Sequence, residues 1–159
     1  MPQQPRRHFE GRQSHYICKT GPVLGLQSGY DPGPGVGYDK VYVEVLAYPS
    51  VAAVAEGFVG VEVENADSNE AKLVTRVTLP SYGDESSAVT MNGTVLGSGS
   101  HISEGLAVVR CESIVVRVVV SDDNGSSVDV DALDAFTRTV TARAQQALDH
   151  TTPTAAVAL

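Results

Sequence analysis

The sequence predicts an α+β fold, in which an antiparallel β-sheet is packed by two helices. Three observations predict this class. Val, Ala, Gly, Ser and Thr dominate where an all-helical protein would show Leu, Glu and Lys. Two β-branched runs flank the two-residue segment Glu112-Ser113, which indicates a hairpin. An amphipathic stretch follows, with apolar residues every three or four positions, and it indicates a C-terminal helix that packs on the sheet.

The first expected strand covers residues 40–48, where valines alternate with unlike side chains at the period of two of a pleated strand. Pro49 ends it, and Ser50 is the expected N-cap of a short helix over residues 51–56. The remaining expected strands cover residues 72–79, 87–91, 94–96, 106–111 and 114–120.

Two of these strands depend on the dipeptide Asn92-Gly93, which is the strongest short signal for a tight hairpin. We therefore expect residues 87–91 and 94–96 to pair across it. The strand over residues 114–120 is apolar on both faces except at Arg117, so it should lie in the centre of the sheet.

The C-terminal helix is expected to begin at a cap formed by Asp129 or Asp131. Its expected sheet-facing residues are Leu133, Phe136, Val140, Ala144 and Ala147.

The length of 159 residues fits one domain, which we place at residues 15–150. A flexible N-terminal arm, residues 1–14, should precede it, and a disordered tail, residues 151–159, should follow it. Four glycines and two prolines over residues 29–37 predict an irregular loop rather than a helix or strand.

The charge distribution argues against nucleic-acid binding. The net charge is −8, and residues 1–20 hold four basic residues against one acidic residue, so they carry +3 and the remainder carries −11. An acidic body repels phosphate backbones, and the short basic lead lacks aromatic residues interleaved with its charges, as a single-strand binder would have them.

No run approaches the ~20 apolar residues of a membrane span, and the first thirty residues lack the apolar stretch of a signal peptide. We expect an extracytoplasmic location if an upstream leader has been removed, and a cytoplasmic one otherwise. Two cysteines are too few for a disulfide scaffold, which leaves one bridge or two buried thiols.

No motif specifies a reaction, so we expect no catalytic residue, no metal and no cofactor. The glycine-rich segment 33–37 precedes a strand, whereas a phosphate loop follows one. Asp122-Asp123-Asn124-Gly125 would need an acid at Val120 to be a calcium loop. His101 lies beside Ser100, Ser103 and Glu104, but neighbours in sequence do not make a catalytic triad.

Four tyrosines, Tyr30, Tyr38, Tyr42 and Tyr48, flank or line the first expected strand beside the glycine- and proline-rich loop. Amphipathic rings beside a loop are typical of a ligand groove. Packing at the edge of a sheet stays open as the alternative.

The order of elements over residues 40–149, with the turn Leu79-Pro80-Ser81-Tyr82-Gly83-Asp84-Glu85, resembles small extracytoplasmic domains of actinobacteria. These include cell-envelope lipoproteins and the extracellular sensor domains of receptor kinases. The resemblance implies an antiparallel sheet packed by helices, an envelope location and a role in ligand sensing. It also implies a structural disulfide, for which Cys18 and Cys111 are the candidates.

We therefore expect a non-catalytic ligand-binding or sensing domain of the cell envelope. Its groove would lie between the sheet and a helix, bordered by residues 30–48 and by the 81–85 turn with Tyr82 and Asp84. The expected partner is a small molecule or an envelope protein, and the expected state is a monomer or weak homodimer. A small cofactor-free enzyme of the lyase or cyclase type, with a pocket on the sheet, and a structural or assembly protein remain alternatives.

Overall fold

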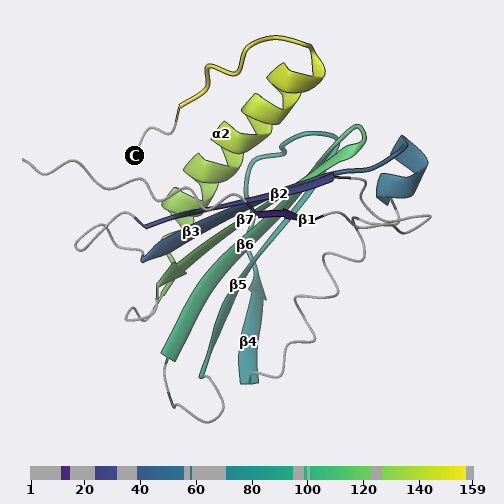
Figure 1. Cartoon of the computed structure of the whole chain (residues 1–159). Helices are drawn as coiled ribbons and strands as arrows, with labels where there is room; N and C mark the ends of the chain where they lie inside the picture. The colour runs from purple at the N-terminus through teal and green to yellow at the C-terminus, as the bar shows by residue number, and fades with distance from the viewer. Residues whose placement is uncertain are drawn as a thin grey trace, which may run out of the picture.

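The computed structural model is an antiparallel β-sheet with one long helix, α2 (Val130–Leu148), lying across one face (Figure 1). This arrangement confirms the predicted α+β class. The structure describes residues 12–14, 24–31, 39–55, 58, 71–94, 99, 101–122 and 127–156.

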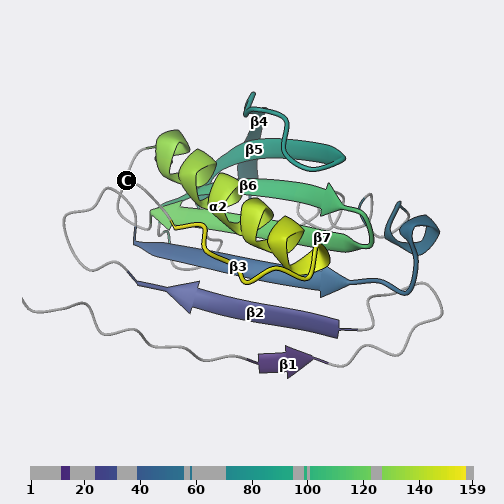
Figure 2. The ribbon, with the colours of Figure 1, turned by 90° about the horizontal axis from the view of Figure 1, so that it is seen from above.

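The seven strands within the described residues lie in the order β1-β2-β3-β7-β6-β5-β4, and each neighbouring pair is antiparallel (Figure 2). β7 lies between β3 and β6, which confirms that the valine-rich strand is central. The strands are β1 (Arg12–Ser14), β2 (Leu24–Tyr30), β3 (Lys40–Ala47), β4 (Ala71–Arg76), β5 (Glu85–Thr94), β6 (His101–Cys111) and β7 (Ile114–Asp122).

The sheet carries an apolar core on each face, because alternate side chains of β6 and β7 are apolar on both sides. On the helix side, Val109 and Val118 pack with Leu133 of α2. On the opposite side, Val108 and Val115 pack with other apolar residues, two of which, Val54 and Phe58, lie in helical conformation after β3. The predicted short helix is confirmed over residues 51–55, where the backbone N–H of Ala53 donates to Ser50 Oγ at 3.1 Å.

The β6–β7 hairpin is confirmed at the predicted place, with Cys111 opposite Ile114 and Glu112-Ser113 between them. Glu112 adopts a positive φ of 50°, which the tight turn requires. Of the two predicted caps of α2, the structure selects Asp129, whose Oδ1 accepts from the backbone N–H of Ala132 at 2.9 Å.

The predicted hairpin at Asn92-Gly93 is wrong. β5 runs through both residues, and they pair with β6 on one side and with β4 on the other. The Ser103 hydroxyl also donates to Asn92 Oδ1. Pairing on two sides outweighs a local turn preference, so Asn92 and Gly93 lie in the middle of a three-strand ladder.

Two further segments differ from their predictions. β2 pairs with β3 along its whole length and includes Gly29 and Tyr30, two residues of the predicted irregular loop. β1 lies at residues 12–14, inside the predicted flexible arm, and pairs with β2. β1 and β2 contain no valine, and their strand conformation depends on pairing with a neighbouring strand. Composition alone therefore does not predict them.

The C-terminal residues 151–156, predicted to be disordered, lie against α2. The backbone N–H of Thr154 donates to Gln146 Oε1 at 2.9 Å, and Arg143 Nε donates to the Ala155 carbonyl at 2.6 Å. Ala147, predicted to face the sheet, is exposed.

Candidate functional site

A cavity of about 710 Å³ lies where β4 separates from β5. Its described lining comes from the end of β4, from residues 77–82, from β5 and β6, and from Thr137 of α2. One part of the predicted border, the 81–85 turn, therefore reaches the cavity through Ser81 and Tyr82.

The cavity results from strands of unequal length. β4 pairs with β5 only from Ala71 opposite Thr94 to Arg76 opposite Val89. One more hydrogen bond, from the Val77 N–H to the Ala88 carbonyl, follows at 3.0 Å. Beyond it the chain leaves β5, whose residues 85–87 continue to pair with β6 alone among the described strands.

Consecutive residues of β5 (86–89) and β6 (106–109) line the cavity. Because successive side chains of a strand point to opposite faces, the cavity reaches both faces of the sheet at this edge. Its lining includes residues of both apolar cores, Ala107 and Val109 on the helix side and Val108 on the opposite side, and these three residues are almost fully buried.

Among the described lining residues, the polar side chains are hydroxyl groups and one cation, Arg76. The Thr137 hydroxyl donates to the Leu133 carbonyl at 2.6 Å, so its proton is already used within α2. The described lining contains no carboxylate, imidazole or thiol, which are the side-chain groups that most often act as general bases or bind metal ions. Such a site can hold an amphipathic molecule by apolar contact and a few polar groups.

Tyr82 connects the cavity wall to α2. Its hydroxyl donates to Asp134 Oδ1 at 2.7 Å. Burial, and then the hydrogen bond and charge of Asp134, raise the pKa of Tyr82 to about 12. The phenol therefore stays protonated near neutral pH, where it fixes the wall rather than accepting a proton.

The next residue, Gly83, lies against the β6–β7 hairpin with a φ of +61°. A Cβ at this position would stand 2.3 Å from the Arg110 carbonyl oxygen and 2.9 Å from Cys111 Sγ. Both the backbone conformation and the close approach require glycine.

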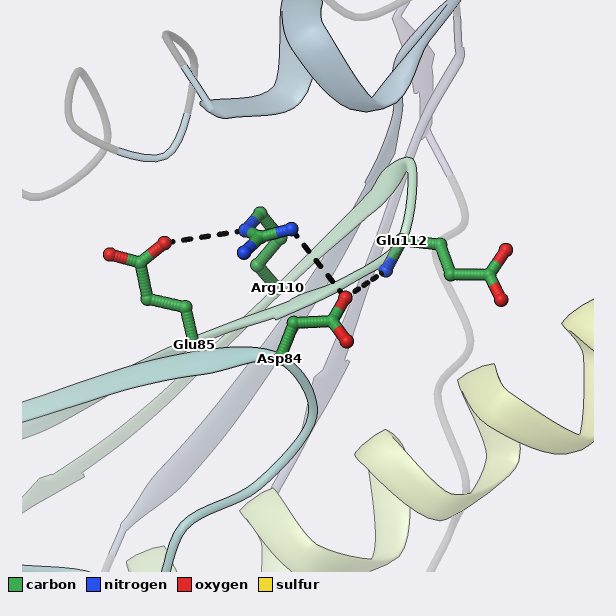
Figure 3. Close-up of polar contacts among 4 residues, drawn as sticks. All are labelled: Asp84, Glu85, Arg110 and Glu112. Atoms are coloured by element: carbon green, nitrogen blue, oxygen red, sulfur yellow. Dashed lines mark hydrogen bonds and ion pairs between the residues drawn. The ribbon is translucent and has the colours of Figure 1, made fainter.

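Asp84 and Glu85 hold the same hairpin by its polar groups (Figure 3). Asp84 Oδ2 accepts from the backbone N–H of Glu112 at 2.6 Å and lies 3.5 Å from Arg110 Nη1. Arg110 Nε donates to Glu85 Oε2 at 3.3 Å. Asp84, predicted to bind ligand, thus accepts a backbone N–H of the hairpin turn and is not among the described lining of the cavity.

The structure does not bring the predicted tyrosines together. The Tyr30 ring lies on the helix side, with its centroid 6.4 Å from that of Phe136. Tyr42 follows the buried Val41 on β3 and points to the opposite face, where it is 40% exposed. Tyr48 is buried in the core of that opposite face, and Tyr38 is outside the described residues.

Cys111 has a free thiol that is 1% exposed. Burial, with a smaller contribution from the charge of Asp84, raises its pKa to about 11. No disulfide is seen in the described residues, and Cys18 lies outside them. His101 is exposed at the start of β6, away from the described cavity lining.

No family model matches the chain, and neither a curated protein nor a solved structure is found to be similar to it. Over the described ranges, no cluster of three or more His, Cys, Asp or Glu could hold a metal ion. No helix in the described part of the chain has the length and apolar character needed to cross a membrane.

Proposed function

We propose that the chain is a non-catalytic ligand-binding or sensing domain of the cell envelope, and that the cavity beside β5 is its binding site. The cavity carries this proposal. Its volume of about 710 Å³ lies within the range of small-molecule sites, roughly 300–1,000 Å³. Its lining, in which apolar residues outnumber the hydroxyl groups and Arg76, is also typical of such sites.

The chemistry of the lining supports binding over catalysis. The enzyme alternative would be favoured by a pocket that encloses His101, but His101 is exposed and outside the described lining. Tyr82 in the lining is held in its protonated form by burial and by Asp134, which raise its pKa. The envelope location comes from the resemblance to actinobacterial sensor domains, and fractionation of native cells tests it.

Binding can be tested with N-phenylnaphthylamine, a neutral apolar dye that becomes fluorescent when it leaves water. We expect the wild-type chain to bind it in a saturable manner. Ser86→Phe places a large ring at an exposed position of the lining, so it should reduce the affinity at least about tenfold by filling the site.

Thr94→Phe is the matched control, because Thr94 is also exposed and lies on the same face of β5 but outside the described lining. It should leave dye binding unchanged. Far-UV circular dichroism should show that both variants are folded. Equal binding by the wild type and the Ser86→Phe variant would refute the cavity as the site.

A further inference from the structure

We propose that the cavity selects anionic amphipathic molecules and that Arg76 binds their acidic head group. This inference rests on the proposed function and adds to it the chemical class of the ligand. Its first support is that Arg76 is the one charged side chain in the described lining.

The position of Arg76 fits an amphipathic ligand. It is the last residue of β4 and is exposed. Because Arg76 pairs with Val89 and Val74 pairs with Met91, the Arg76 side chain shares one face of the sheet with these three apolar residues, which also line the cavity. Val74 is 45% exposed and Val89 is half-buried, so a molecule with its acidic group at Arg76 would place its apolar part against them.

The carboxylates of the 84–85 turn and of Asp134 on α2 already have partners. Asp84 and Glu85 contact Arg110, and Asp134 accepts the Tyr82 hydroxyl. Arg76 is thus the feature that distinguishes an acidic head group from a neutral one. A guanidinium presents paired donors that match the oxygens of a carboxylate, phosphate or sulfonate.

The net charge of the chain makes this preference diagnostic. With a net charge of −8, the protein as a whole repels anions, so long-range electrostatics disfavours an anionic ligand relative to a neutral or cationic one. Tighter binding of an anion than of its neutral analogue requires a local cation, and Arg76 is the one that the described lining offers.

Two dyes that share one aromatic framework separate the contribution of the acidic group to binding from that of the apolar rings. Anilinonaphthalene sulfonate carries the acidic group that N-phenylnaphthylamine lacks. We expect the Arg76→Gln variant to bind the sulfonate about tenfold more weakly, as the loss of a charge-assisted hydrogen bond implies. Its affinity for the neutral dye should not change, and Arg76→Lys, which keeps the charge but not the fork, should give an intermediate loss.

Arg143→Gln is the matched control, since it changes the net charge equally but alters a residue of α2 that contacts the Ala155 carbonyl. It should leave the affinity for both dyes unchanged. Competition by laurate and by dodecyl phosphate, both below their micelle concentrations, then shows whether the head group is a carboxylate or a phosphate.

The outcomes distinguish this inference from the proposed function. If the neutral dye binds and Ser86→Phe blocks it, but Arg76→Gln leaves sulfonate binding intact, the anion preference is refuted and the binding domain stands. An equal loss for both dyes in Arg76→Gln would also refute it. If neither dye binds the wild type, the proposed function itself fails.

Discussion

The two ends of the connection between β4 and β5 differ sharply in how they are held. At the β5 end, Gly83 and Asp84 lie against the β6–β7 hairpin, and Tyr82 is bonded to α2. At the other end, β4 stands last in the order of described strands, and Leu73 is 70% exposed. The fixed end forms one wall of the cavity, and the exposed end brings Arg76 to it.

This difference separates residues that maintain the fold from those that are available to a ligand. The Gly83-Asp84-Glu85 turn is one basis for the predicted resemblance to sensor domains, which stays a prediction, and the side chains of Asp84 and Glu85 contact the hairpin (Figure 3). Such a turn can be required in different proteins without any common ligand, because its partners are the backbone and side chains of one hairpin. Ligand selection would then depend on the residues that line the cavity.

The largest effect should come from Gly83→Ala. Its Cβ would collide with the Arg110 carbonyl and Cys111 Sγ, in a backbone conformation that disfavours alanine. We expect a loss of about 3–5 kcal/mol in the free energy of unfolding, measured with urea.

Gly99→Ala separates the two causes. Gly99 has a similar φ of +71°, but a Cβ there would meet nothing within 4 Å. This variant should lose only the conformational part, about 1–2 kcal/mol. Equal losses at both glycines would show that the contact of Gly83 with the hairpin is unimportant.

A smaller effect is expected from Asp84→Ala. The carboxylate accepts a short hydrogen bond from Glu112 and contacts Arg110, but it is partly exposed. Its removal should cost about 1–2 kcal/mol of unfolding free energy. Glu85→Ala removes only an exposed ion pair with the same arginine, so it should cost less than about 0.5 kcal/mol. A larger loss for Glu85→Ala than for Asp84→Ala would mean that Glu85, and not Asp84, makes the main contact with the hairpin.

Tyr82→Phe should cost about 1 kcal/mol near neutral pH, because the hydrogen bond to Asp134 is lost and the ring remains. The pH dependence gives an independent measurement. Burial and Asp134 raise the pKa of Tyr82 from 10.0 to about 12. The phenol therefore contributes stability that is fully present below pH 10 and is lost as the pH rises through 12.

Ultraviolet difference titration of wild type against Tyr82→Phe isolates this tyrosine from the other five. The difference signal should rise near pH 12, provided that the protein is still folded there. A midpoint near pH 10 in the folded protein would mean that the Asp134 contact does not hold the wall.

The sequence predicts the strongly held part of the molecule better than the exposed part. The β-branched run over residues 114–120 and the helical period after Asp129 each reflect burial, so they identify β7 and α2 correctly. The hairpin predicted at Asn92-Gly93 is wrong because a turn preference is local, whereas the conformation of β5 depends on its pairing with β4 and β6.

The site was predicted only in part. Tyr82 could be nominated from its turn, but Arg76 and Thr137 carry no signal, since a charged residue in a strand and a threonine in a helix are ordinary. The cavity itself depends on β4 ending before β5 does, and the end of a strand beside its partner is a property of the assembled sheet.

The smallest effect should come from Leu73→Thr on β4. The side chain is 70% exposed, and threonine keeps a high strand preference, so the free energy of unfolding should change by less than about 0.5 kcal/mol. Val118→Thr on β7 is the contrast, because it places a hydroxyl in the buried core and should cost about 1–3 kcal/mol. A comparable loss at Leu73 would mean that β4 is covered in solution, and the exposed end of the cavity would then have to be reassigned as an interface.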